Sequence, residues 1–232
     1  DMVGKWYNAG LKDLNRARTD HGLPALTHSL DQLKSVATVI LGTSRAFDLP
    51  HDPDGFVYAG PLFDTVKPTT PSPLVEADRP NILLSFSTTY QDQAPLFSRC
   101  LKALEPLDAN IIVTTGPAID PASLTGGTKA KIVRYAPHDD IVPWCDLVVS
   151  HGGHGTILRP IRHGVPVLCL TMGRDHPDNA VRLEHYGAGL RLSKRASAAK
   201  IRARAQQIMG DPRFKAAATD LGQRIKATLT QD

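Results

Sequence analysis

From residue 81 onward the chain alternates short runs of apolar residues with segments in which apolar residues recur every three or four positions. The apolar runs predict six β-strands: Ile82–Ser87, Ile111–Thr115, Lys131–Tyr135, Asp146–Ser150, Pro166–Leu170 and Gly189–Leu192. Most of these runs are continuously apolar, which is typical of strands covered on both faces. Strands that alternate with helices predict an α/β fold with a Rossmann-like, doubly wound parallel sheet.

The segments between and after these strands have helical spacing. Their defining positions are Leu96, Phe97, Cys100, Leu101 and Leu104; Ala180, Leu183, Glu184 and Gly187; Ala198, Ile201, Ala205 and Ile208; and Phe214, Ala218, Leu221 and Ile225. Pro177 is expected near the start of the second of these helices, and Asp211-Pro212 predicts the start of the last one.

Residues 1–66 follow a different pattern. Val3–Arg18 predicts a helix, Val36–Leu41 a buried strand and Phe56–Ala59 a second, short strand. Two strands and one or two helices bury themselves poorly, so we expect exposed apolar surface in this part of the chain.

The domain organisation expected from these patterns has three parts. Residues 67–80 contain four prolines among threonines and serines, which predicts a linker. Residues 1–66 are then the remnant of one domain, and 81–232 form a second domain that is complete. Because the first residue is Asp1 rather than Met, we expect a fragment or a processed product.

Composition narrows the class of protein. The 232 residues are 41% hydrophobic and 22% charged, which excludes wholesale disorder, and no apolar run is long enough to predict a membrane-spanning helix. The net charge of +4 is too small to indicate a partner that is a nucleic acid. The three cysteines show no CxxC spacing and predict reduced thiols in a cytoplasmic protein. Ten basic residues between Arg191 and Lys226 predict a solvated helix face, with peripheral attachment to a membrane as the alternative.

A glycine-rich loop follows the fourth predicted strand directly, with the sequence His151-Gly-Gly-His-Gly-Thr156 before a helical segment. Glycines at a strand-to-helix junction let the backbone approach a ligand, and the helix start presents free N–H groups that suit a phosphate. The loop matches neither GxGxxG nor a P-loop. A tight turn without a ligand is the alternative, and Pro160 is expected in the first turn of the helix.

The histidines of this region also raise the alternative of a metal site. His151 and His154 are three residues apart, with His163 and His176 nearby, but no Asp or Glu lies between His151 and His163. Histidine ligands usually need a third partner in a fixed geometry, so we expect no metal here.

Three further loops follow predicted strands and are therefore expected at the same edge of the sheet. Asp175 and His176 are suited to binding sugar hydroxyls, or else cap the next helix. Tyr135-Ala-Pro-His138 offers an aromatic ring and exposed backbone to a nucleobase, or else Tyr135 is a core residue. The run Ser85–Thr89 offers hydroxyls, or else only forms a turn. Together the loops predict a site for a nucleotide and a polyol.

At these loops the sequence resembles a known family, the GT-B glycosyltransferases of the UDP-glycosyltransferase type, particularly bacterial enzymes that glycosylate natural products and lipids. The resemblance covers about a quarter of the chain and consists of five pieces in order: Tyr135–His138, His151–Thr156, Gly164–Pro166, Asp175–Asn179 and Gly187–Gly189. It implies that the chain is the C-terminal, donor-binding half of a GT-B fold, with only the tail of the N-terminal acceptor domain.

The resemblance also implies roles for individual residues. The donor diphosphate would be held by His151, Gly153, Gly155, Thr156 and Thr88; the nucleobase by Tyr135, Pro137 and His138; and the donor sugar by Asp175 and His176. Three positions depart from the family pattern: His176 replaces the usual glutamine, Arg159 a glutamate that binds the ribose, and Ser87 a glycine.

The function that follows from the resemblance is inverting transfer of a hexose from a UDP- or dTDP-sugar to a hydroxyl of a hydrophobic small molecule or lipid, without a metal cofactor. Such transfer needs a general base at the acceptor hydroxyl. No histidine of this chain matches the family's base, so we expect the base upstream of residue 1 and no turnover by this chain alone. The alternative is a non-catalytic nucleotide-sugar-binding module or subunit, whose residues 1–66 associate with a partner chain or a second copy.

Overall fold

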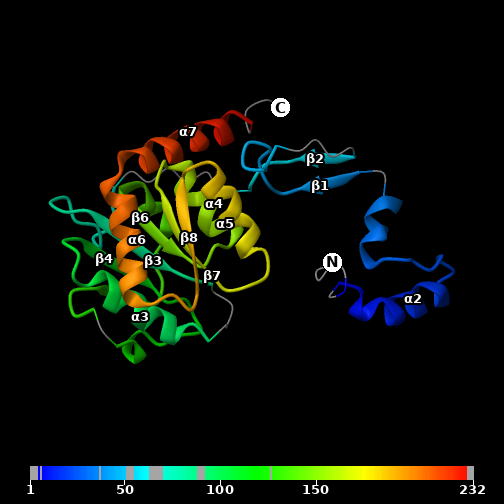
Figure 1. Cartoon of the computed structure of the whole chain (residues 1–232), viewed down its shortest axis with the longest axis horizontal. Coiled ribbons are helices and arrows are strands. Elements are labelled where there is room, and N and C mark those ends of the chain that lie inside the picture. The colour runs from blue at the N-terminus through cyan, green and yellow to red at the C-terminus, as the bar shows by residue number, and fades with distance from the viewer. Residues whose placement is uncertain are drawn as a thin grey trace. The chain divides into compact units, whose positions relative to one another are not determined.

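The computed structural model describes residues 5, 7–36, 38–50, 55–62, 70–87, 92–125 and 127–228, without the side chains of Lys34 and Ser35. The chain forms two compact units, and Figure 1 labels their elements. The smaller unit comprises Asp1–Gly42 and His51–Ala59, and the larger unit comprises Thr43–Pro50 and Gly60–Asp232.

The larger unit is built on a six-stranded parallel sheet with the order β5-β4-β3-β6-β7-β8. Figure 1 labels all of these strands except β5. Its strands are β3 (Asn81–Ser85), β4 (Asn110–Thr114), β5 (Lys131–Val133), β6 (Leu147–Ser150), β7 (Val167–Thr171) and β8 (Gly189–Ser193). All six predicted strands are present, and the doubly wound parallel sheet is confirmed. The order reverses between β3 and β6, where Ser85 pairs with Ser150 at the carboxyl ends. Ligands bind at such switch points in open α/β sheets.

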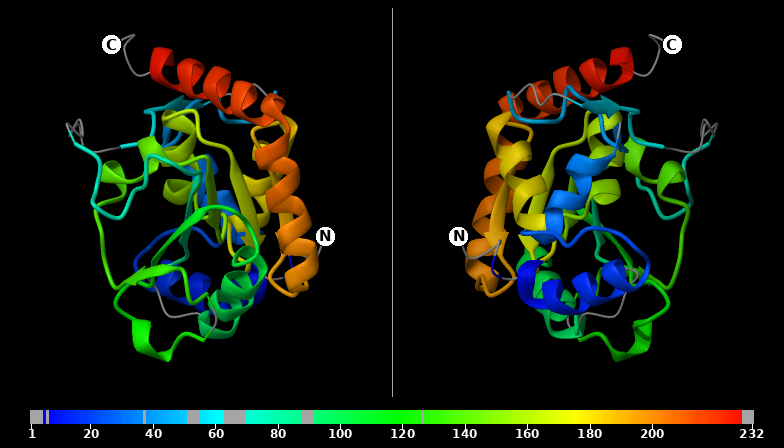
Figure 2. Two further views of the ribbon diagram at one scale, coloured as in Figure 1. Left: turned by 90° about the vertical axis from the view of Figure 1, so that its left-hand side faces the viewer. Right: turned by 90° about the vertical axis from the view of Figure 1, so that its right-hand side faces the viewer.

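Helices cover both faces of this sheet (Figure 2). One face packs against α3 (Ala94–Leu104) and α6 (Ala198–Gly210). The other packs against α4 (His154–Arg162), α5 (His176–His185) and α7 (Pro212–Thr228). Alternate residues of one strand serve the two cores, so Leu83 packs on the side of α4 whereas its neighbours in β3 pack on the side of α3. Short 3-10 turns complete the unit at Pro121–Ser123, His138–Asp140 and Val142–Trp144.

Helix α4 differs from the expectation at Pro160. The proline is an interior residue of the helix, not a member of its first turn. It has no N–H to donate to the carbonyl of Thr156, and the helix ends two residues later at Arg162. Packing stabilises the helix despite this, because the backbone of α7 lies directly against α4 at Gly222, where a Cβ atom would overlap the Ile161 carbonyl.

The smaller unit contains η1 (Asn8–Gly10), α2 (Leu11–Asp20), η2 (Ser29–Ser35) and a two-stranded parallel sheet of β1 (Val39–Leu41) and β2 (Phe56–Tyr58). The predicted burial of the first strand is wrong, because Ile40 is 70% exposed. Helix α2 has no buried residue, so nothing it contributes forms a core for these strands. The expected exposed apolar surface is confirmed by Ile40, Phe56 and Val57.

The compact units divide the chain at other positions than residues 66 and 80. Residues 43–50 belong to the larger unit, where Phe47 is 1% exposed in the core on the side of α4. Asp48 accepts a hydrogen bond of 2.8 Å from Arg182 of α5. The segment expected as a linker also contacts this unit, since Leu74 packs on the same core and its carbonyl accepts from the Lys131 ammonium at 2.9 Å.

Cys100, Cys145 and Cys169 are free and buried, as expected. Within the ranges given above, none of the helices combines the length and apolar character needed to cross a bilayer.

Candidate functional site

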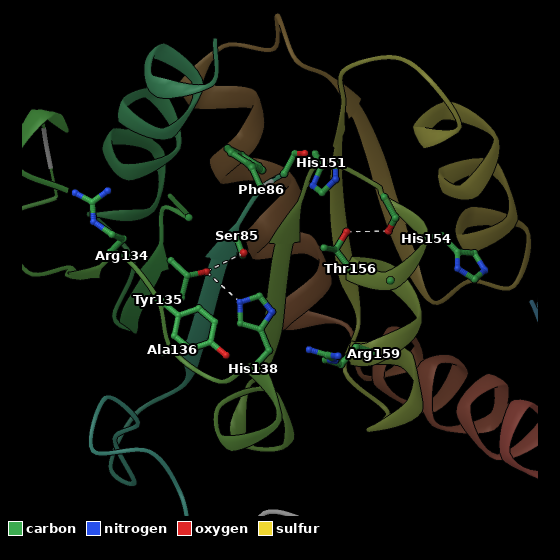
Figure 3. Close-up of a pocket in the computed structure, with 15 residues that line it drawn as sticks. Ser85, Phe86, Arg134, Tyr135, Ala136, His138, His151, His154, Thr156 and Arg159 are labelled. Carbon is green, nitrogen blue, oxygen red and sulfur yellow. Dashed lines mark hydrogen bonds between the residues drawn. The ribbon is translucent and has the colours of Figure 1, made fainter. Parts of the chain in front are cut away.

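A cavity of about 410 Å³ opens at the carboxyl ends of β3, β4 and β6, at the switch point of the sheet (Figure 3). Its lining comprises Ser85, Phe86, Ser87, Thr114, Gly116, Arg134, Tyr135, Ala136, His138, His151, Gly153, His154, Gly155, Thr156 and Arg159. These described lining residues include two arginines and three histidines but no carboxylate. The lining therefore favours an anionic ligand.

The glycine loop between β6 and α4 forms one wall of the cavity. Gly153 precedes α4 with φ −64° and ψ 146°, a conformation open to any residue, but a Cβ atom there would lie 2.5 Å from the Nε2 atom of His151. Gly153 is needed for room, whereas Gly152, with φ +93°, is needed for its backbone conformation. A Cβ atom at Gly155 would meet no atom within 4 Å.

Hydroxyl groups close the same loop. The Ser150 hydroxyl donates to Thr156 Oγ1 at 2.8 Å, and the Thr156 hydroxyl donates to the Gly153 carbonyl at 2.8 Å. The Gly152 N–H donates to Ser150 Oγ at 3.2 Å. The amides of Thr156 and Ile157 donate to the Gly153 carbonyl at 3.0 and 3.1 Å, so the amides that this helix start offers to a ligand are those of His154 and Gly155. Ser150 was not singled out from the sequence, although its place at the end of β6 could have indicated it.

His151 lies at the centre of this wall and is almost fully buried, with 6% of its surface exposed. Its ring meets the ring of His176 edge to face, with centroids 4.6 Å apart. Burial, and then the neighbouring His176, lowers the pKa of His151 to about 4. His151 is thus neutral at pH 7 and offers one N–H.

The opposite wall carries the residues expected to bind a nucleobase. Tyr135 is 78% exposed, so it is not a core residue. The Thr114 hydroxyl donates its hydrogen to Ser85 Oγ at 2.8 Å. Its oxygen also lies 3.1 Å from His138 Nε2, and because the hydroxyl hydrogen is already used, this second bond requires an N–H at His138 Nε2 (Figure 3). Burial, with Arg159 adding to it, lowers the pKa of His138 to about 4 and keeps it neutral. Pro137 stands between two lining residues but is not itself in the lining.

Arg159 brings a cation to the position where the resemblance implied a ribose-binding glutamate. It projects from α4 toward the cavity, and its Nε lies 3.4 Å from a carboxylate oxygen of Asp139. Asp139 itself is not among the lining residues.

Asp175 and His176 stand apart from the cavity lining. Asp175 precedes α5 without capping it through its side chain, and its carboxylate accepts from Asn179 at 2.7 Å. His176 is buried behind the glycine loop. Thr88 lies outside the described residues.

The sequence analysis did not assign four of the lining residues to a ligand site: Thr114, Gly116, Arg134 and His154. His154 was considered only as a metal ligand. The residue belongs to the cavity lining, but its ring points away from the cavity (Figure 3), and its Nε2 lies 2.8 Å from the hydroxyl of Thr43. Arg134 lines the opposite end, beside Tyr135. No pattern in the sequence connects His154 with Thr43, which is 111 residues away. The part of the chain that the structure describes holds no cluster of three metal-ligating side chains.

Comparisons with known proteins identify the family of this chain and its fold. Residues 98–230 match the family described as "Erythromycin biosynthesis protein CIII-like, C-terminal domain". The chain is 25% identical over 224 residues to 4'-demethylrebeccamycin synthase of Lentzea aerocolonigenes, covering 91% of this chain and 53% of that protein. Overall it spans about half the length of the curated relatives it matches.

Solved structures share the fold. The glycotransferase of kitacinnamycin aligns with a TM-score of 0.81 at 19% identity, covering 98% of this chain and 62% of that one. The glycosyltransferase VinC, solved in complex with dTDP, aligns with a TM-score of 0.68 at 21% identity, covering 98% and 55%. The chain thus has the Rossmann-like fold of the C-terminal half of GT-B glycosyltransferases and belongs to the erythromycin biosynthesis protein CIII-like C-terminal domain family.

Proposed function

We propose that this chain binds the nucleotide-sugar donor of a glycosyltransferase. The observation that carries the proposal is the cavity at the switch point, where His151, the glycine loop and the start of α4 converge and the described lining contains no carboxylate. Free amides and a neutral imidazole N–H suit a diphosphate. The dTDP in the related structure of VinC and the names of the curated relatives support the same class of ligand.

The proposed ligand contacts divide between the two walls of the cavity. His151, Gly153, Gly155 and Thr156 hold the diphosphate, with Thr88 as a further partner. Tyr135, Pro137 and His138 hold the nucleobase. Asp175, whose carboxylate is exposed next to the glycine loop, holds hydroxyls of the donor sugar. His176 follows it in the sequence and is the first residue of α5.

The proposed reaction of the whole protein is inverting transfer of a hexose from a UDP- or dTDP-sugar to a hydroxyl of a hydrophobic acceptor. In this reaction a base removes the proton of the acceptor hydroxyl while the bond from the sugar to the diphosphate breaks. The amides of α4 and His151 stabilise the charge that develops on the leaving diphosphate, without a metal ion. The base is proposed to lie outside this chain, which then binds the donor but does not transfer the sugar. The proposed location is the cytoplasm, where the three buried thiols stay reduced.

Calorimetric titration of the chain with dTDP and with UDP tests this proposal, with His151→Ala as the matched variant. We expect saturable binding of at least one nucleotide, unchanged by EDTA. Loss of one hydrogen bond to a charged group corresponds to about 1.5–3 kcal/mol, so His151→Ala should weaken binding by about 10- to 150-fold. If the folded chain binds neither nucleotide, the proposed donor site is contradicted. Sugar transfer by the chain alone would contradict the proposal that the base lies outside this chain.

A second candidate function is a nucleotide-sugar-binding subunit that works with a separate catalytic chain. The exposed apolar side chains Ile40, Phe56 and Val57 of the small sheet favour it, because exposed apolar surface of this kind is typical of sites where proteins associate. Sedimentation of the purified chain as a monomer, without self-association or capture of a partner, would count against this candidate.

A further inference from the structure

The contact between His176 and His151 assigns a different task to His176 from that of a sugar ligand. The His176 ring is 3% exposed and is absent from the described lining of the cavity. It lies edge to face against the ring of His151, at an interplanar angle of 80°. His176 therefore contacts the wall of the cavity at His151 and is not itself part of the described lining.

The ring nitrogens of His176 make no hydrogen bond to the described residues. Among the described residues, its Nδ1 has no hydrogen-bond partner, and its Nε2 lies 3.9 Å from a carboxylate oxygen of Asp175. This distance is too long for a hydrogen bond. The contribution of His176 is therefore its flat ring, which packs against the ring of His151.

Helix α5 also holds the glycine loop from behind. A Cβ atom at Gly152 would lie 3.2 Å from the carbonyl oxygen of His176, so the two backbones are in close contact. Asn179 donates to the Gly152 carbonyl at 3.2 Å and to the carboxylate of Asp175 at 2.7 Å. With Gly153 in front of His151 Nε2 and His176 behind its ring, His151 is held from both sides.

We propose that His176 is a positioning residue, which fixes the His151 imidazole for the donor diphosphate and does not itself read the donor sugar. The proposal rests on the proposed function of the cavity, and it concerns the diphosphate part of the donor alone. It implies that the identity of the sugar is read by other groups, of which the exposed carboxylate of Asp175 is the nearest.

Replacement of the ring separates the two roles. His176→Gln keeps a polar side chain of the kind that could bond a sugar but removes the ring, whereas His176→Phe keeps a ring and removes both nitrogens. We expect His176→Gln to weaken binding of dTDP, which carries no sugar, by at least about fivefold, and His176→Phe to stay within about twofold of the parent chain. The double variant His151→Ala/His176→Gln should bind dTDP no more weakly than His151→Ala, because residues that act through one another are not additive.

The outcome that overturns the proposal is the reverse pattern. If His176→Gln and His176→Phe both bind dTDP like the parent chain and lose only the extra affinity for dTDP-glucose, His176 reads the sugar. Thermal unfolding of each variant shows whether it is folded under the conditions of the titration.

A measurement without nucleotide keeps this proposal distinct from the proposed function. In ¹⁵N-histidine NMR spectra, His176→Gln should shift the ring nitrogens of His151. The matched control His185→Gln, an exposed position of the same helix, should leave them unchanged. Unchanged His151 signals in His176→Gln would refute the positioning role, whereas absence of nucleotide binding by the parent chain would refute the donor site instead.

Discussion

Substitution of Gly153 by alanine is the most direct test of how the glycine loop shapes the site. The backbone at Gly153, with φ −64° and ψ 146°, accepts alanine without strain. The added Cβ atom would lie 2.5 Å from His151 Nε2, and ordinary contact begins at 3.4 Å, so the His151 ring must retreat by about 0.9 Å. The ring of His176 stands behind it and opposes this movement.

The magnitude of the effect follows from this displacement. A hydrogen bond of about 2.9 Å that lengthens by nearly 1 Å is no longer a hydrogen bond. The loss of one such bond to a diphosphate oxygen corresponds to about 1.5–3 kcal/mol. Gly153→Ala should therefore lower the affinity for dTDP or UDP by about 10- to 150-fold, close to the effect of His151→Ala. Crowding of the buried ring should also reduce the free energy of unfolding by about 1–3 kcal/mol.

Calorimetry and urea unfolding measure the two effects, with Gly210→Ala as the matched control. Gly210 ends α6, and a Cβ atom there meets nothing within 4 Å, so this variant should bind nucleotide like the parent chain. The reasoning is refuted if Gly153→Ala binds within twofold of the parent chain while His151→Ala does not.

Three other predictions concern packing, stacking and pH. Gly222→Ala should lower the free energy of unfolding by about 2 kcal/mol or more, measured with urea, because its Cβ atom overlaps the Ile161 carbonyl where α4 and α7 meet; an unchanged urea midpoint would contradict this packing. Tyr135→Ala should weaken binding of dTDP by about tenfold in calorimetry without changing the melting temperature, since the ring is exposed and is proposed to stack on the base; equal affinity would remove Tyr135 from the site. Burial lowers the pKa of His138 from 6.5 to about 4, so the unfolded chain binds a proton in this range that the folded chain does not. The stability linked to this proton is complete above pH 6.5 and is lost as the pH falls toward 4. His138→Gln should therefore lose less free energy of unfolding than the parent chain between pH 7 and pH 5. An equal loss in both proteins would contradict the burial of a neutral His138.

The strands of the larger unit could be predicted from the sequence because each is a run of apolar residues with helical spacing on either side. Parallel strands place their carboxyl ends together, so the loops that begin at Tyr135 and His151 could be assigned to one edge before their contacts were known. The burial of the Val36–Leu41 run could not be predicted, because an apolar run does not state what covers it. Contacts over long sequence separation, such as that of His154 with Thr43, leave no local pattern.

The buried ring of His176 shows the same limit in another form. In the sequence it stands beside Asp175 at the start of a helix, and both appear equally available to a ligand. In the fold, the Asp175 side chain at the start of α5 is exposed to solvent, whereas the His176 ring is buried beneath the glycine loop. Which of two adjacent residues faces a ligand is set by the packing of the helix, and the order of residues alone does not contain it.

The place of Phe47 in the core has a consequence for protein engineering. Chimeric glycosyltransferases that exchange donor modules would naturally be spliced in the proline-rich stretch around residues 67–80, downstream of Phe47. Such a splice would separate the sheet from a ring that fills its core, and an emptied phenylalanine site costs about 3–5 kcal/mol, a large part of the stability of about 5–15 kcal/mol typical of a domain. A transplantable module should therefore begin before Thr43, so that it includes Phe47 together with the sheet against which this ring packs.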